Sequence, residues 1–227
     1  MKIPEYYYDH TFIPFKNQLI GKRSPMRYAA GETLINVGEY MTNTYYIHQG
    51  ILKLAVVANT GAEKTALFVG PGGLFPLYSP PERRYREERD ELVVRAQTDV
   101  VVTKIPQQHV AELIDHEPRF ARTMLRQYAD FSAILLYDAI NLASQDNLTK
   151  VCSYLYQYEK LLRPHGIILT QEEIASNIGI PLLTLSRYLQ KLRQRGIIST
   201  ARKQIHILDW PRLIKLCSPE LLAPHAN

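Results

Sequence analysis

The stretch TQEEIASNIGIPLLTLSRYLQKLRQRGIIST, residues 170–200, decides the fold of the C-terminal part of the chain. Its first four residues have the Ser/Thr-x-x-Glu form of a capping box, in which the Thr170 side chain accepts from the backbone of Glu173 and Glu173 reaches back. A helix should therefore begin there. Gly179-Ile180-Pro181 should end this helix after about two turns, because glycine adopts a left-handed backbone and proline cannot continue a helix.

A second helix should follow and run to Gln194 or Arg195. Leu185, Leu189 and Leu192 recur at helical spacing and form its buried face. The residues toward the other side are Leu182, Leu183, Ser186, Arg187, Gln190, Lys191 and Gln194. A short helix, a glycine-containing turn and a longer helix with a polar and basic outer face form the helix-turn-helix pattern.

A hairpin is predicted directly after the second helix. Residues 197–200 and 204–208 alternate as strands around Ala201-Arg202-Lys203, which gives a wing with a basic tip. A helical hairpin alone could arise by chance. The capping box, glycine turn, basic helix and basic wing occur here in the order of a winged helix-turn-helix, which predicts binding to double-stranded DNA.

Positive charge is concentrated in the same part of the chain. The net charge is +5, and residues 148–227 contain eleven Lys or Arg against five Asp or Glu, a net of +6. The preceding 147 residues therefore carry 16 basic and 17 acidic side chains, a net of −1. A phosphate-binding module needs such an excess, although a solvated basic face explains the charge equally well.

Several protein classes are disfavoured by composition. No run approaches the roughly 18 apolar residues of a membrane span, and the start of the chain lacks the pattern of a signal peptide, so a cytoplasmic protein without membrane contact is expected. Two cysteines, Cys152 and Cys217, cannot form a four-cysteine metal site or a disulfide framework, and they are expected to be partly buried thiols rather than a redox switch. No metal or cofactor is predicted.

Catalysis is not predicted either. No Ser/His/Asp spacing, metal cluster or phosphate-cradling loop supports the alternative of an enzyme on a β-sandwich scaffold.

Residues 26–106 are predicted to form a small antiparallel sandwich or barrel. Short runs rich in Val, Ile, Tyr and Leu are separated by Gly, Pro and Asn, as expected for strands and turns. The runs are 44–48, 51–57, 65–69, 91–96 and 100–105. Residues 79–90 are rich in proline and charge, so a mobile surface loop is predicted there.

A long helix is predicted after this region, because neither glycine nor proline occurs between Pro118 and Pro164. Apolar residues follow a repeat of about 3.5, with Asp138 interrupting it, and this seam predicts dimerisation. The proposed dimer contacts are Met124, Tyr128, Phe131, Leu135 and Leu142. The alternative is that the stripe packs on its own sheet, although a helix of this length outruns a small domain.

At these residues the chain resembles the cyclic-AMP receptor/FNR family of bacterial transcription regulators, over nearly its whole length. The matching segments are Tyr28-Ala29-Ala30-Gly31-Glu32-Thr33-Leu34-Ile35, Gly38-Glu39, Tyr45-Tyr46-Ile47, Gly50, Asp146, Lys150 and Thr184-Leu185-Ser186-Arg187. The resemblance implies an α+β fold: an antiparallel, jelly-roll-like β-roll sensor domain over 1–117, a long dimerisation helix over 118–147 and a winged helix-turn-helix over 148–227. It also implies an effector-responsive homodimer on a palindromic promoter site, with RNA polymerase a candidate partner.

The resemblance places base-reading residues at the start of the recognition helix. Arg187 would contact guanine, with a phosphate contact or a surface ion pair as alternatives. Leu182 and Leu183 depart from the family's polar residues, and they can touch thymine methyl groups or pack against the protein. The predicted DNA contacts are Leu182, Leu183, Thr184, Ser186, Arg187, Gln190, Lys191, Arg202 and Lys203.

The sensor domain departs from the nucleotide-binding members of this family. They hold the ribose with a glutamate and the phosphate with an Arg-Ser pair, where this chain has Leu77 and Asp90-Glu91. Because two carboxylates repel a phosphate, a small apolar or aromatic effector is predicted instead of a cyclic nucleotide. The expected pocket comprises Phe75, Leu77, Tyr78, Phe131, Leu135 and Leu136, with the Tyr78 hydroxyl as an orienting group.

Other interpretations of the sensor domain stay open. Residues 72–78 resemble the branch of the family that senses halogenated aromatics, but the same side chains could be β-roll core. His48, His109 and His116 leave a haem-dependent gas sensor as an alternative. The β-roll could also be a ligand-free scaffold of a constitutive DNA-binding protein.

Overall fold

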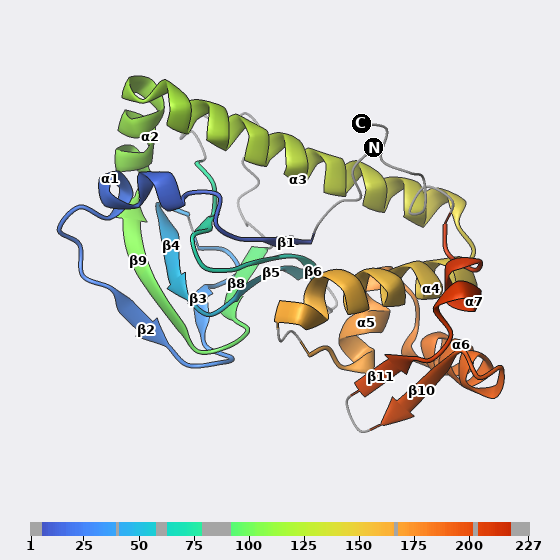
Figure 1. The fold of residues 1–227 in the computed structure, drawn as a ribbon. Helices are drawn as coiled ribbons and strands as arrows, with labels where there is room; N and C mark the ends of the chain where they lie inside the picture. The colour runs from blue at the N-terminus through green and yellow to red at the C-terminus, as the bar shows by residue number, and fades with distance from the viewer. Residues whose placement is uncertain are drawn as a thin grey trace. The chain divides into compact units, whose positions relative to one another are not determined.

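The computed structural model describes residues 6–39, 41–57, 63–78, 92–165, 168–201 and 204–218, without the side chains of 141–144 and 165. The chain divides into two compact units. One comprises Tyr7–Ser132, and the other comprises Met1–Tyr6 together with Ala133–Asn227. The division falls inside the long helix, labelled α3 in Figure 1.

The first unit is a β-roll of two sheets. Its strands are β1 Tyr7–Tyr8, β2 Met26–Tyr28, β3 Thr33–Ile35, β4 Asn43–Gln49, β5 Leu52–Val57, β6 Glu63–Val69, β7 Leu74–Phe75, β8 Leu92–Ala96 and β9 Val100–Pro106. One sheet has the order β1-β6-β5-β8-β3 and the other β2-β9-β4-β7. The predicted antiparallel roll is confirmed, except that β1 runs parallel to β6. The predicted loop over 79–90 lies outside the described residues.

Two apolar cores stabilise the β-roll. The larger core draws buried side chains from both sheets, including Ile47, Leu52 and Val102. The second core forms where η1 Ile13–Phe15, α1 Lys16–Ile20 and α2 Gln107–His116 meet the ends of β4 and β9 (Figure 1). Phe12 and Phe15 both pack against Phe120 there, at ring centroid distances of 5.8 and 5.2 Å.

The helix α3 spans Pro118–Ser144 and ends before the predicted limit of 147. Its predicted apolar seam separates into two rows. Met124 is 3% exposed and belongs to the second core, and Phe131 packs against both cores, whereas Tyr128 and Leu135 are 39% and 66% exposed. The prediction that Met124 contributes to an exposed dimer seam was therefore wrong, because its side chain packs into the second core of its own unit. The side chain of Leu142 lies outside the description.

The second unit contains the C-terminal helices and a hairpin. Its elements are α4 Asn147–Gln157, a π-helix η2 Tyr158–Leu162, η3 Arg163–His165, α5 Gln171–Ile178, α6 Leu182–Gln194, β10 Ile198–Ala201, β11 Gln204–Ile207 and α7 Trp210–Ile214. Asp146 caps α4 by accepting from the backbone N–H groups of Leu148 and Thr149 at 2.8 and 3.1 Å. These hydrogen bonds lower the pKa of Asp146, and the bond from the Thr149 backbone has the largest effect.

The acidic residue that interrupts the seam of α3 has a structural partner. The buried hydroxyl of Tyr6 donates to the Asp138 carboxylate at 2.5 Å. Burial, reinforced by this carboxylate, raises the pKa of Tyr6, so the phenol stays protonated and can donate. The partner of Asp138 lies 132 positions earlier in the sequence. The helical repeat of α3 therefore could not predict this contact.

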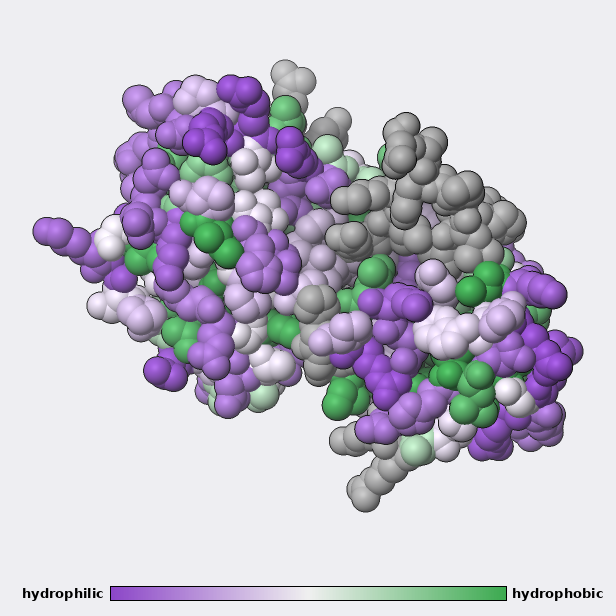
Figure 2. Space-filling view, in the orientation of Figure 1, coloured by the Kyte–Doolittle hydropathy of each residue, from purple (hydrophilic) through white to green (hydrophobic). Residues whose placement is uncertain are grey.

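One face of the molecule is mainly polar in the part of the chain that the structure describes. On the face that Figure 2 shows, hydrophilic side chains predominate over both units and hydrophobic ones interrupt them. Among the described residues no helix is both long enough and apolar enough to cross a membrane.

Candidate nucleic-acid interface

The first helix of the helix-turn-helix is fixed by its two ends. The Thr170 hydroxyl accepts from the Glu173 N–H at 3.2 Å, and the Glu173 carboxylate accepts from the Thr170 N–H at 2.9 Å. The predicted capping box is therefore confirmed. Gly179 ends the helix at φ +69°, a left-handed conformation that favours glycine. Pro181 then precedes α6 in an extended conformation, so the turn between the helices is short.

One face of α6 is buried as the leucine spacing predicts. Leu185, Leu189 and Leu192 are 0%, 3% and 1% exposed. Burying a leucine stabilises the fold by about 1.5 to 3 kcal/mol, so these side chains hold α6 firmly in its unit. The opposite row is solvent-exposed and consists of Leu183, Arg187, Gln190, Lys191 and Gln194.

A hollow of about 300 Å³ separates the start of α6 from the wing. Leu182 and Ser186 from α6 line it, together with Ile205 from β11 and Gln171 from α5. The Ser186 hydroxyl lies 3.5 Å from the Gln171 side-chain oxygen, to which it donates. The predicted contact residues of α6 other than Thr184 therefore fall into two rows, one along this hollow and one on the outer face. Thr184 is half-buried and belongs to neither row.

The wing is an antiparallel hairpin of β10 and β11. Ile198 pairs with Ile207 and Ala201 pairs with Gln204. Both tip residues that were predicted to bind DNA, Arg202 and Lys203, lie outside the described residues. Their contribution to DNA binding stays a prediction.

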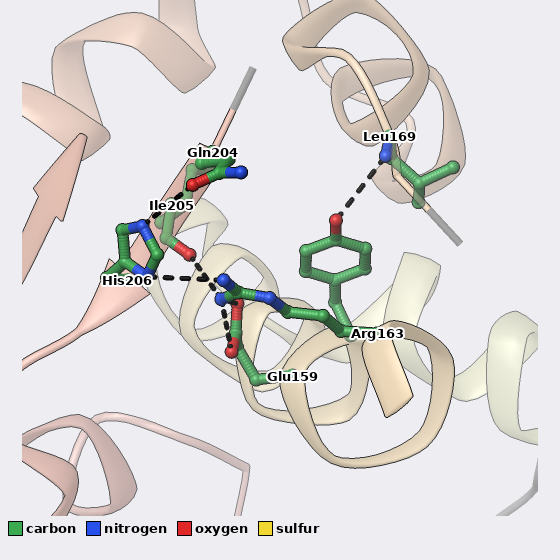
Figure 3. Close-up of polar contacts among 7 residues, drawn as sticks. Glu159, Arg163, Leu169, Gln204, Ile205 and His206 are labelled. Atoms are coloured by element: carbon green, nitrogen blue, oxygen red, sulfur yellow. Dashed lines mark hydrogen bonds and ion pairs between the residues drawn. The ribbon is translucent and has the colours of Figure 1, made fainter. Parts of the chain in front are cut away.

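A polar clamp joins the wing to the region after α4 (Figure 3). The Arg163 Nη1 donates to both carboxylate oxygens of Glu159, at 2.6 and 2.8 Å, and to the carbonyl of Ile205 at 3.2 Å. Its Nη2 lies 3.2 Å from Nδ1 of His206, and Nε2 of His206 lies 3.1 Å from the Gln204 side-chain oxygen. One guanidinium thus connects the π-helix with strand β11.

The clamp requires a defined form of His206. A guanidinium can only donate, so Nδ1 must accept and the proton must lie on Nε2, facing the Gln204 oxygen. Sequence reasoning missed this clamp. The spacing of four between Glu159 and Arg163 could have suggested the ion pair, but nothing in the sequence joins Arg163 to a residue 43 positions later.

Replacing Arg163 with Met is expected to destabilise the second unit by about 1.5 to 3 kcal/mol, because charged hydrogen bonds are lost and the Glu159 carboxylate loses its cation. The measurement is urea unfolding followed by the fluorescence of Trp210, the single tryptophan, whose ring centroid lies 4.5 Å from the Lys160 ammonium. Arg163→Lys keeps the positive charge but lacks the planar guanidinium with its several donors. Its unfolding midpoint should therefore lie between those of the wild type and Arg163→Met. Equal midpoints for all three proteins would contradict a stabilising clamp.

The predicted effector residues are divided between the two units. Phe75 and Leu77 are 4% and 5% exposed and belong to the β-roll cores, and Phe131 packs edge-on against Tyr8 at 5.1 Å. Tyr78 is partly buried beside the second core, and its carbonyl accepts from the Tyr128 hydroxyl. Leu135 and Leu136 are 66% and 65% exposed and fall in the other unit.

Three histidines bear on the haem alternative, and each has a hydrogen-bond partner. His48 contacts the Thr103 hydroxyl, His109 the Gln18 carbonyl and His116 the Glu112 carbonyl, all at 2.8 Å. Burial lowers the pKa of His48. Within the described ranges, no group of three His, Cys, Asp or Glu residues is arranged to hold a metal ion.

Both cysteines are buried and free. Burial raises the pKa of Cys152 and of Cys217 to about 12, so little thiolate is present at neutral pH. Because the thiolate is the form that oxidises, this environment disfavours a redox switch.

Comparison with known protein families agrees with this architecture. The model of the Crp-like helix-turn-helix domain matches residues 149–216, and that of the cyclic nucleotide-binding domain matches residues 25–117. The chain belongs to the Crp/FNR family. Members of this family are transcription regulators with a DNA-binding helix-turn-helix. Similar to this chain is the transcriptional activator protein Anr of Pseudomonas aeruginosa, 22% identical over 216 residues, which are 90% of this chain and 84% of Anr.

Solved structures share the fold of this chain. FixK2 from Bradyrhizobium japonicum has a TM-score of 0.70 at 21% identity and covers 86% of this chain and 98% of its own. CprK complexed with OCPA has a TM-score of 0.63 at 17% identity, and the match covers 89% of this chain and 95% of the CprK chain. Because such low identity supports only a shared fold, the predicted membership of the branch that senses halogenated aromatics stays a prediction.

Proposed function

We propose that this Crp/FNR regulator is an effector-controlled homodimer that binds a palindromic promoter site. The observation that carries the proposal is the outer face of α6, where Arg187, Gln190 and Lys191 are exposed opposite three buried leucines. Such a helix can enter the major groove while its leucines stay in the protein. The wing beside it would contact the phosphate backbone.

Dimerisation is supported by the outer face of α3. Exposed apolar side chains recur along this single helix at Leu125, Tyr128, Leu135, Leu136 and Ile140. A continuous apolar stripe of this kind is a liability in a monomer, and a second copy of the same helix would cover it. Two recognition helices related by a two-fold axis would then read two half-sites about one helical turn apart.

The proposed effector is a small apolar or aromatic molecule that acts by shifting the dimer between two arrangements. The groups near the proposed pocket are apolar, with Phe75 and Leu77 buried and Tyr78 and Phe131 partly buried. The Tyr78 hydroxyl is the proposed orienting group for a phenol or an aromatic acid. An effector can shift the population only as far as its affinities for the two arrangements differ.

A constitutive DNA-binding protein is the second candidate function. The observation that favours it is the burial of Phe75 and Leu77 in the β-roll cores, where a ligand would have to displace packed side chains. The two candidates differ in one measurable property. Operator affinity that stays constant across a panel of aromatic acids and phenols would favour the constitutive protein, and a change with one compound would favour effector control.

Replacing Arg187 with Ala tests the proposed function directly. The full-length protein should select a defined sequence from random duplexes, and the variant should lose preference at one base pair per half-site, at a cost of about 1 to 3 kcal/mol per contact. Lys191→Ala is the matched control, because loss of a phosphate contact lowers affinity for all sequences and reduces the salt slope by about 0.9 per half-site. Identical preferences for wild type and Arg187→Ala would contradict base reading by this residue.

A further inference from the structure

The start of α6 carries two neighbouring leucines that the structure separates. Leu182 is 40% exposed and lines the hollow beside the wing, together with Ile205. Leu183 is 63% exposed and is not among the residues that line this hollow. The two side chains point to different surroundings, so only Leu183 shares the outer row with Arg187.

Leu183 differs chemically from the rest of this outer row, in which the other members are Arg187, Gln190, Lys191 and Gln194. Residues four apart on a helix are about 5 to 6 Å apart at Cβ, and base pairs rise by about 3.4 Å. Leu183 and Arg187 therefore reach base pairs within about two steps of each other. A leucine has no donor or acceptor, so it cannot pair with the polar groups of a base edge.

The apolar group that the major groove displays is the C5-methyl of thymine. We infer that Leu183 selects a thymine in each half-site through this methyl group, within about two base pairs of the guanine bound by Arg187. Leu182 takes no part in base reading because it faces the wing. This inference rests on the proposed function, since it requires that α6 enters the major groove.

The test replaces single thymines by deoxyuridine, which removes only the methyl group. The full-length chain first selects its duplex from a random pool at low salt, and each thymine of that duplex is then substituted in both half-sites. At one symmetric position the dissociation constant should rise about fourfold per methyl, or about fifteenfold for the two half-sites. Leu183→Ala should bind the thymine duplex about fifteenfold more weakly than the wild type does. Its dissociation constant should not change when uracil replaces thymine.

Leu182→Ala is the matched control and should keep the response to uracil, as should Arg187→Ala. Since Leu183 is exposed, its replacement should leave the thermal unfolding midpoint unchanged. The inference is overturned if Leu183→Ala still responds to uracil, if Leu182→Ala loses the response, or if no thymine responds while Arg187 still governs a guanine. Failure to select any sequence would instead remove the proposed function, and this inference with it.

Discussion

A glutamate in place of Leu135 is expected to convert the protein from a dimer to monomers and to weaken operator binding by about 10² to 10⁴. Leu135 is 66% exposed on α3, where Tyr128 and Leu136 are also exposed. At a dimer seam, the introduced carboxylate would meet its symmetric copy in an apolar environment, which is costly. Each monomer would then bind a half-site alone and lose the benefit of the second contact.

Light scattering should report the mass of one chain for Leu135→Glu and of two chains for the wild type. Arg126→Glu is the control, because Arg126 is also exposed on α3 but lies outside the apolar row. A dimeric Leu135→Glu protein would move the interface away from this face of α3. Phe131 is unsuitable for this test, since it packs against Tyr8 in the β-roll unit and a charge there would disturb the fold.

Cyclic AMP is expected to give no binding signal in calorimetry at millimolar concentration. Where the nucleotide-binding members of the family hold the ribose with a glutamate, this chain has Leu77, which is 5% exposed within an apolar core. The sequence resemblance places Asp90 and Glu91 where those members hold the phosphate, and both residues lie outside the described part of the chain. Losing two charge-assisted contacts corresponds to a loss of about 10² to 10⁴ in affinity, before the repulsion between like charges is added.

The control is a cyclic-nucleotide-binding relative titrated in the same buffer, with an aromatic acid and a phenol titrated into both proteins. Tyr78→Phe should weaken a phenolic effector and leave DNA binding by the unliganded protein unchanged. Micromolar or tighter binding of cyclic AMP would contradict the prediction and return this chain to the nucleotide-sensing branch.

The sequence by itself determined the helix-turn-helix and most of the strands. The capping box at Thr170, the glycine at 179 and the leucines at 185, 189 and 192 act within a few residues of one another, so their geometry follows from local chemistry. The runs of β-branched and aromatic residues likewise became β4, β5, β6, β8 and β9. The short strands β1 and β7 were not predicted, because two residues carry no periodicity.

The tertiary structure alone decided which neighbour each face meets. Helical spacing places Met124 and Leu135 within one stripe, but packing against the β-roll buries the first and leaves the second in solvent. The sequence grouped Leu182 with Leu183 on one side of α6, whereas in the structure only Leu182 lines the hollow beside the wing. A repeat fixes angles around one helix axis, whereas contacts such as that between Arg163 and His206 depend on where the chain returns after 43 residues.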